Sequence, residues 1–138
     1  MKVTQISVFM ENKNGRLAEI TKLLASKNIS LRAVTIADTA DFGILRLIVK
    51  EPDRTRDVLL EAGFTARETD VLAVAMEDKP GALADVMELF EKNNVNIEYL
   101  YSILAGKGDK ADIVFRVEDL ERGQILLKQN GYDRPLDL

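Results

Sequence analysis

The chain has 138 residues, of which 46% are hydrophobic and 30% charged, and its formal net charge is −4. It contains no cysteine and no histidine, which excludes disulfides, thiolate metal sites, a cysteine nucleophile and the usual neutral-pH base. No apolar run is long enough to span a membrane, and the N-terminus shows no apolar signal region, so we expect a cytoplasmic protein that does not bind membranes. The acidic excess lies in the second half of the chain and argues against binding of nucleic acid.

One stretch of the sequence occurs twice. Residues 8–18 read VFMENKNGRLA, and 66 residues later residues 74–84 read VAMEDKPGALA. Val, Met, Glu, Lys, Gly, Leu and Ala recur at the same offsets. The repeat divides the chain into two halves, which we interpret as two domains, residues 1–69 and 70–138. A domain of that size buries only roughly 60% of its unfolded surface, so we expect the halves to pack on each other and on a second chain as a homodimer.

The pattern of apolar residues predicts the elements of the first half. Alternating apolar residues indicate strands, and apolar stripes at helical spacing indicate helices. The predicted strands are Thr4 to Met10, Ser30 to Ala37, Gly43 to Lys50 and Phe64 to Glu68. The predicted helices run from the turn at Gly15 to Lys27 and Asn28, and from Pro52 to Gly63. Proline suits the first residue of a helix, and Gly63 suits a left-handed cap at its end.

The second half repeats this order. Strands are predicted at Val71 to Met76, Asn96 to Leu104 and Asp112 to Val117, and helices at Gly81 to Asn93 and Leu120 to Gln129. The last segment, Tyr132 to Leu138, contains Pro135, which confines it to a sheet edge or a frayed tail. Each half is therefore β-α-β-β-α-β, an α+β ferredoxin-like unit whose antiparallel sheet carries both helices on one face. The linker between the halves consists only of Thr69 and Asp70, which is too short for the two halves to move independently.

The repeated turn joins the end of a strand to the start of a helix. The first N–H groups of a helix lack internal partners and carry partial positive charge, so they can hold a carboxylate. Gly15 and Gly81 permit a tight turn and close approach of a ligand, while Asn12 and Asp78 can accept a hydrogen bond from an ammonium group. Together these groups suit a zwitterion such as a free amino acid. The alternative is that Asn or Asp before Gly supplies turn and cap chemistry alone.

The two motifs resemble a known family. Residues 77–86, EDKPGALADV, followed after a helix by Asn94-Val95-Asn96-Ile97, resemble the ACT domain. Residues 11–20, ENKNGRLAEI, followed by Asn28-Ile29-Ser30-Leu31, resemble a second copy, so the resemblance covers nearly the whole chain. The first copy departs from the family pattern by carrying Asn14 where proline is usual.

The resemblance implies where ligands bind. ACT domains are mostly small-molecule sensors, typically for amino acids, associated with metabolic enzymes and regulators. Two ACT units are implied to set their sheets side by side, with ligands at the interface between the loop of one unit and the second strand of its neighbour. Carried over by position, the implied ligand-binding residues of the first half are Met10, Asn12, Asn14, Gly15, Arg16, Leu17 and Ser30, and those of the second are Met76, Asp78, Pro80, Gly81, Ala82, Leu83 and Asn96.

Further residues on the second strands could line a pocket for the ligand's side chain. They are Val34, Ile36, Leu100 and Ser102. Such a pocket would be apolar and without cationic side chains apart from Arg16, so it favours a branched-chain or aromatic amino acid. Leu17 and Leu83 also fit the apolar stripes of their helices and are expected to anchor them in the core.

The sequence therefore favours a non-catalytic regulatory protein that binds a free amino acid, needs no cofactor or metal and acts on a metabolic enzyme. The alternative is an assembly module for such an enzyme, with vestigial ligand sites. An acylphosphatase-like enzyme would use an arginine in the glycine loop, but Arg16 aligns with Ala82 in the second copy. An RNA-binding sheet needs paired aromatic residues and a basic face, and a metal carrier needs Cys or His.

Overall fold

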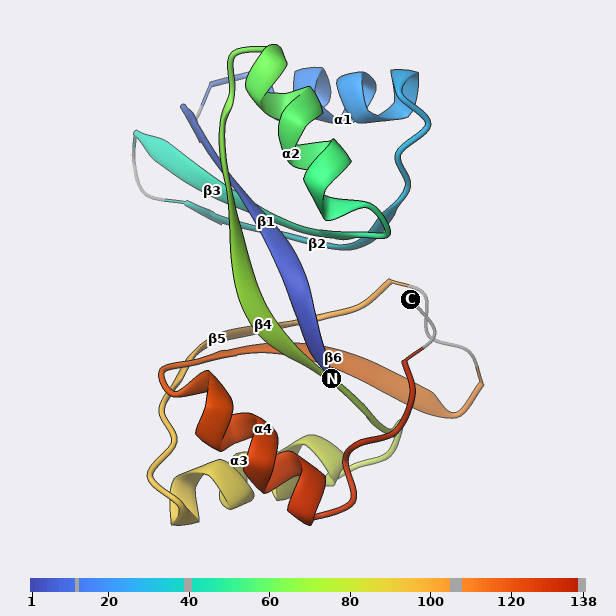
Figure 1. Cartoon of the computed structure of the whole chain (residues 1–138), viewed down its shortest axis with the longest axis vertical. Coiled ribbons are helices and arrows are strands. Elements are labelled where there is room, and N and C mark those ends of the chain that lie inside the picture. The colour runs from blue at the N-terminus through green and yellow to red at the C-terminus, as the bar shows by residue number, and fades with distance from the viewer. Residues whose placement is uncertain (12, 39–40, 105–107, 137–138) are drawn as a thin grey trace. The chain divides into compact units, whose positions relative to one another are not determined.

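The computed structural model describes residues 1–11, 13–38, 41–104 and 108–136 (Figure 1). Its strands are β1 (Lys2–Glu11), β2 (Leu31–Asp38), β3 (Phe42–Val49), β4 (Thr65–Glu77), β5 (Ile97–Ser102) and β6 (Lys110–Val117). Its helices are α1 (Arg16–Ser26), α2 (Pro52–Glu61), α3 (Ala82–Lys92) and α4 (Leu120–Gln129). None of the helices in the described part of the chain is long and apolar enough to cross a membrane.

The chain forms two compact units. The first unit is Thr4–Thr69, and the second is Asp70–Leu138 together with Met1–Val3. Strand β4 runs without interruption from Thr65 to Glu77, so the fourth strand predicted for the first half and the first strand predicted for the second half are one strand. That residues 1–69 and 70–138 are the two domains stays a prediction.

The first unit is an antiparallel sheet with two helices on one face. The strand order is β2-β3-β1-β4, and β3 pairs antiparallel with both β1 and β2. Helices α1 and α2 lie on the same side of this sheet (Figure 1). The core between them is a single apolar cluster formed by Ile6, Val8, Met10, Ile20, Leu24, Leu45, Leu47, Val49 and Leu59.

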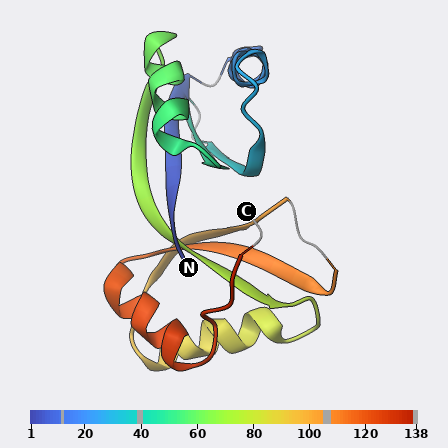
Figure 2. The same ribbon diagram turned by 45° about the vertical axis from the view of Figure 1, so that its right-hand side comes forward.

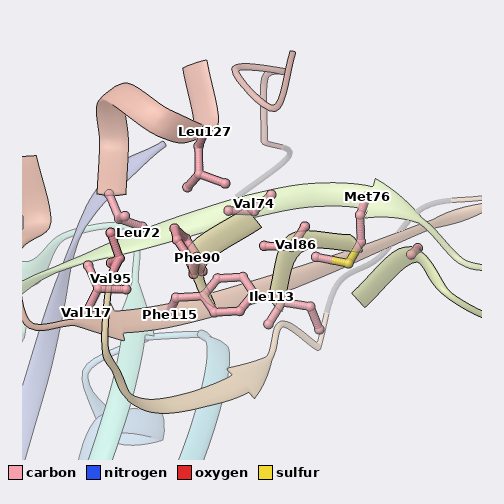
Figure 3. Close-up of a cluster of buried hydrophobic side chains, with 11 residues drawn as sticks. Leu72, Val74, Met76, Val86, Phe90, Val95, Ile113, Phe115, Val117 and Leu127 are labelled. Atoms are coloured by element: carbon pink, nitrogen blue, oxygen red, sulfur yellow. The ribbon is translucent and has the colours of Figure 1, made fainter. Parts of the chain in front are cut away.

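The second unit repeats this architecture. Its strands follow the order β4-β6-β5, with both pairs antiparallel, and α3 and α4 lie on one face of the sheet (Figure 2). Its core contains Leu72, Val74, Val86, Phe90, Val95, Phe115 and Leu127 (Figure 3). Phe90 on α3 and Phe115 on β6 meet edge to face, with ring centroids 5.8 Å apart, a geometry that aromatic rings favour.

The α+β class and the repeated ferredoxin-like units are confirmed, with one difference in the second unit. Residues 132–136, which follow α4, form no strand, and residues 137 and 138 lie outside the described part. The place beside β4 is taken instead by the start of β1, because the N–H of Ala73 donates to the carbonyl of Met1 at 2.7 Å. Pro135 has no N–H to donate to a neighbouring strand, and it restricts the backbone conformation of Arg134 before it. These two effects explain why this segment forms no ladder of hydrogen bonds.

Left-handed residues mark both ends of α1 and α3. The helices begin on Gly15 and Gly81, whose φ angles are +90° and +91°. They end before Asn28 and Asn94, with φ angles of +57° and +55°. After each asparagine an aliphatic N–H returns to the helix, since Ile29 donates to Leu24 and Val95 to Phe90, both at 2.9 Å. The repeated Asn-aliphatic pairs are thus helix C-terminal caps.

We expect a truncation in either core to destabilise the chain as a whole, because β4 contributes to both units. Leu24 and Phe90, at repeat-related positions, are 1% and 0% exposed, so Leu24→Ala should cost about 2–5 kcal/mol and Phe90→Ala about 3–5 kcal/mol. Leu60→Ala is the control, since Leu60 is 47% exposed. Urea unfolding followed by circular dichroism should show one transition in every variant. A transition that splits in two would contradict this and support independent domains.

We also expect Gly81→Ala to destabilise the protein by about 1–2 kcal/mol, the cost of a left-handed conformation for a residue with a Cβ. The cost is one of backbone strain, because an added Cβ would meet no atom within 4 Å. Asn94→Gly is the matched control, because glycine adopts positive φ freely and stability should not fall. Denaturation midpoints measure both variants, and an unchanged midpoint for Gly81→Ala would mean that the loop can relax to another conformation.

Candidate functional site

The loop between β1 and α1 is closed by backbone hydrogen bonds. The N–H of Lys13 donates to Glu11 O at 2.8 Å, and that of Arg16 donates to Lys13 O at 3.2 Å. The first intrahelical bond follows from Glu19 to Gly15 O at 2.9 Å. The side chain of Lys13 turns back, so that its Nζ lies 2.7 Å from Glu11 Oε2.

The loop between β4 and α3 repeats these three backbone hydrogen bonds. Lys79 N–H donates to Glu77 O at 3.0 Å, Ala82 N–H to Lys79 O at 3.3 Å, and Asp85 N–H to Gly81 O at 2.9 Å. Lys79 Nζ lies 2.5 Å from Glu77 Oε2. The N–H of Asp78 donates to Asp109 O at 2.7 Å, which ties this loop to the turn before β6. The repeat therefore extends from the sequence to the loop geometry.

Neither α1 nor α3 has a side-chain N-cap within the described residues. The N-cap residue is Gly15 or Gly81, which has no side chain to accept a hydrogen bond. Helix α4 shows the contrast, because the carboxylate of Asp119 accepts a bond from Arg122 N–H at 3.1 Å. In α3 the N–H groups of Leu83 and Ala84 precede the first intrahelical bond, so they remain open to an external acceptor.

Charges surround both loops. A hydrogen bond from Lys79 and its positive charge lower the pKa of Glu77, and the charge of Arg134 lowers it further. Lys13 lowers the pKa of Glu11 in the same way, and Arg16 adds to the effect. Both carboxylates are thus ionised at neutral pH. The cation that Arg16 supplies in the first unit is supplied in the second by Arg134, from the segment after α4.

A cleft lies beside each loop, at repeat-related positions. The cleft in the first unit has a volume of about 160 Å³ and is lined by Phe9, Met10, Glu11, Arg16 and Glu19, and by Ala62 to Thr65 after α2. The cleft in the second unit has a volume of about 230 Å³ and is lined by Ala75, Met76, Glu77, Lys79, Ala82 and Asp85, and by Asn130, Gly131, Tyr132 and Arg134 after α4. The structure therefore brings Met10 together with Arg16, and Met76 together with Ala82.

The remaining loop candidates lie at the surface. Asn14, Gly15, Asp78, Pro80 and Gly81 are exposed, while Asn12 lies outside the described residues.

The two leucines that follow the glycines do not anchor the core. Leu17 is 41% exposed and Leu83 is 37% exposed, because each faces outward in the first turn of its helix. The expectation that they anchor the core is wrong. Met10 and Met76 are 7% and 5% exposed and belong to the two cores.

The candidate ligand-binding residues next to the second strands, Ser30 and Asn96, have different surroundings. Ser30, just before β2, lines a cleft of about 140 Å³ with Asn28, Ile29, Arg32, Lys50 and Glu51. Asn96 is exposed before β5, and its carbonyl accepts a hydrogen bond from Glu118 N–H at 3.0 Å.

The side-chain pocket expected from the sequence stays a prediction. Val34 packs against the core of the first unit, and Ile36 and Leu100 are 42% and 40% exposed. Around Ser30, two cationic side chains, those of Arg32 and Lys50, line the cleft.

No group of three or more Asp or Glu side chains within the described residues could hold a metal ion. The groups available to a ligand at the loops are therefore paired surface charges and helix N–H groups beside small clefts.

Comparison with known proteins places the chain in a family. A family model for an ACT domain pair matches residues 1–134, and no curated protein matches. The structure of protein BT0572 from Bacteroides thetaiotaomicron is similar, with 41% identity, a TM-score of 0.88, and coverage of 94% of this chain and 89% of that chain.

The regulatory subunit of aspartate kinase from Thermus thermophilus has the same fold, at 16% identity, a TM-score of 0.64, and coverage of 93% and 92%. The corresponding subunit from Thermus flavus matches at 17% identity, a TM-score of 0.60, and coverage of 91% and 90%. With glycine loops and element order repeated across nearly its whole length, the chain belongs to the family of ACT domain pairs.

Proposed function

We propose that this protein is a non-catalytic regulator that binds a free amino acid through its glycine loops. One observation supports the proposal above others: in both repeats a helix begins on a left-handed glycine, without a side-chain cap among the described residues. A protein that used these loops only as turns would gain stability from a capping side chain, as α4 does with Asp119. The open N–H groups are instead suited to an external anion.

The loop of the second unit offers groups for both ends of a zwitterion. The N–H groups of Leu83 and Ala84 would hold the α-carboxylate at the positive end of α3. The carboxylate of Asp78, exposed beside them, would accept hydrogen bonds from the ammonium group. The first loop would act in the same way, with Asn14 where the second has Pro80. Ser30 and Asn96 would supply further polar contacts, between ACT units as the family resemblance implies.

The residue types most used as a neutral-pH base and as a thiol nucleophile are absent from the sequence. The chain has no histidine or cysteine, and the two loop lysines are ion-paired to Glu11 and Glu77. We therefore propose binding without catalysis, read out by a partner. The two Thermus proteins are, by name, regulatory subunits of aspartate kinase, which supports a metabolic enzyme as the partner at the level of fold analogy. We propose a homodimer as the binding form.

The second candidate is an assembly module without a ligand. It is favoured by an apolar hollow of about 250 Å³ in the first unit, lined by Phe9, Ala37, Asp38, Phe42, Gly43 and Ile44. Phe42 is 63% exposed, and an exposed aromatic side chain of this kind suits a protein interface.

A thermal-shift screen with the twenty amino acids at millimolar concentration tests the proposal. An amino acid present at a hundred times its dissociation constant should stabilise the protein by about 2.7 kcal/mol. Gly81→Ala should weaken the response, because strain at the N-cap displaces the N–H groups that hold the carboxylate. Asn94→Gly should respond as wild type. If no amino acid shifts the midpoint, the sensor proposal fails and the assembly module takes its place.

A further inference from the structure

Strand β2 lies at the end of its sheet and has a free edge. In the strand order β2-β3-β1-β4 of the first unit, β2 is paired on its β3 side alone within the described residues. Residues 33–37 read AVTIA, without charge or proline, and Ile36 is 42% exposed. Folded proteins usually protect sheet edges with charges, proline or bulges, so an uncharged stretch of this kind is suited to pairing with another strand.

A charged residue stands at each end of this uncharged stretch. Arg32 precedes it and Asp38 follows it, and they are the only charged residues of β2. Arg32 is the residue skipped in the register with β3, so it sits in a β-bulge, whereas the strand pairs regularly from Ala33 to Asp38. Opposite charges at the two ends of one strand complement the same strand of a second copy when the two run antiparallel.

Arg32 also has a donor without an acceptor. Its Nε is buried and has no hydrogen-bond partner within the described part of the chain. Such donors are rare in folded proteins and call for an acceptor from elsewhere. The residue as a whole is only partly buried, so its side chain can turn to a carboxylate that arrives at the strand edge. A guanidinium and a carboxylate form strong, paired hydrogen bonds.

Symmetry fixes the possible registers of two copies of β2. In an antiparallel pair, opposite residues either both direct their backbone groups at each other or both direct them away. Two copies present the same alternating set of residues at the edge, so a two-fold axis must pass through a residue and not between two. With the axis at Thr35 the pairing uses the whole stretch, and the opposite pairs are Thr35 with Thr35, Val34 with Ile36, Ala33 with Ala37 and Arg32 with Asp38.

The axis at Thr35 is the one that joins the charges. An axis at Val34 would place Arg32 opposite Ile36, and an axis at Ile36 would place Asp38 opposite Val34. With the axis at Thr35, both charged ends are paired, twice over by symmetry, and the exposed side chain of Ile36 is covered by an apolar neighbour.

Strand β5, at the end of the order β4-β6-β5, does not show the same complementarity. Its register with β6 also skips one residue, Glu98, which is its only charged residue. Glu98 Oε2 lies 3.3 Å from Nε of Arg116, so its charge is already paired. Pairing of β5 with its own copy about Leu100 would place Glu98 opposite Ser102. The charge pattern therefore selects β2 and not β5.

Apolar surface continues from the β2 edge. The hollow of about 250 Å³ is lined by Ala37 and Asp38 of β2 together with Phe9, Phe42 and Ile44, so a copy that pairs with β2 borders it. A strand ladder alone buries little surface, and a stable interface buries about 1,200–2,000 Å². The hollow supplies apolar area beyond the ladder.

We propose that two copies of this chain pair antiparallel through β2 about a two-fold axis at Thr35, with Arg32 of each copy ion-paired to Asp38 of the partner subunit. This inference rests on the homodimer of the proposed function and assigns its interface, without depending on the ligand. Backbone hydrogen bonds and the apolar side chains hold the two strands together. The ion pairs at the two ends fix the register and exclude other edges.

A single introduced cysteine tests the register, because the chain has none of its own. Opposite residues of an antiparallel pair have Cα atoms roughly 4.5–5.5 Å apart, a separation that a disulfide spans. Thr35→Cys should therefore form a disulfide-linked dimer under mild oxidation, seen on a non-reducing gel. Leu100→Cys on β5, where Leu100 is 40% exposed, is the matched control and should remain uncross-linked. The opposite result, with cross-linking of the β5 variant alone, would overturn the inference.

Charge reversal tests the ion pairs. Analytical ultracentrifugation of the full chain, without any amino acid, measures the dimer dissociation constant. Arg32→Asp should raise it roughly tenfold or more, because symmetry converts two attractive pairs into two repulsive ones. Asp38→Arg should do the same, and the double variant should return close to the wild-type constant, since the exchanged charges meet in the same register. Damage to the fold would not be rescued in this way. Glu98→Gln should leave the constant unchanged.

The outcomes separate this inference from the rest of the proposed function. A dimer whose dissociation constant ignores the β2 variants would overturn the inference and leave the homodimer standing. A wild type that stays monomeric at every concentration would overturn both, whereas the amino-acid screen would still decide on the sensor. Oligomers that grow beyond a dimer would indicate head-to-tail pairing of β2 with β5 and would overturn the inference. A dimer that depends on β2 in a protein that binds no amino acid would keep the inference and overturn the sensor.

Discussion

Helices α1 and α3 each begin where the chain leaves a strand and turns back over the sheet within a few residues, and a left-handed glycine makes that turn possible. Gly15 and Gly81 hold nearly the same φ and ψ angles, which a residue with a Cβ adopts only under strain. The turn fixes the direction of the helix and so delivers Ile20 and Val86, at repeat-related positions, into the two cores with no exposed surface. It also leaves the first N–H groups of the helix uncapped. Core packing and the exposure of these N–H groups therefore depend on the same residue.

The two repeats share this scaffold but differ in the charges around it. Arg16 in the first unit corresponds to Ala82 in the second, where Arg134 supplies the positive charge from another segment. Arg32 corresponds to Glu98, and only the latter has its ion pair within the described residues. Duplication has thus preserved the backbone features while the side chains diverged. The two repeats therefore place different charges beside loops that share the same backbone hydrogen bonds in their described residues.

Much of this fold could be predicted from the sequence, because apolar periodicity and the repeated motif reflect local rules. The helix starts at Pro52 and at the glycines, and the antiparallel units, follow from such rules. What could not be predicted depends on pairing between distant segments, such as the N–H of Ala73 with the carbonyl of Met1. Local spacing also misplaced Leu17 and Leu83, since the apolar stripe of a helix does not reveal how much of its first turn the sheet covers.

The candidate site was harder to predict, for a reason visible at β2. One extra residue in a strand moves all later side chains to the opposite face. The bulge at Arg32 therefore directs Val34 to the core with Leu31, although the family resemblance had suggested Val34 as a residue that could line a ligand pocket. Nothing in the sequence around Arg32 signals that extra residue. The positions of the loop glycines were predictable, and the packing of Val34 against the core was not.

The placement of Met1–Val3 in the second unit affects how this protein can be dissected. A cut at the repeat boundary would leave residues 70–138 without the segment beside Ala73, so β4 would become an open edge with unpaired backbone groups. Open edges of this kind invite aggregation. Isolating the second unit intact would require grafting residues 1–3 onto the fragment, in effect a partial circular permutation. A fusion partner at the N-terminus would be attached directly to a strand of the second unit, whereas one at the C-terminus would follow a segment that forms no strand over residues 132–136.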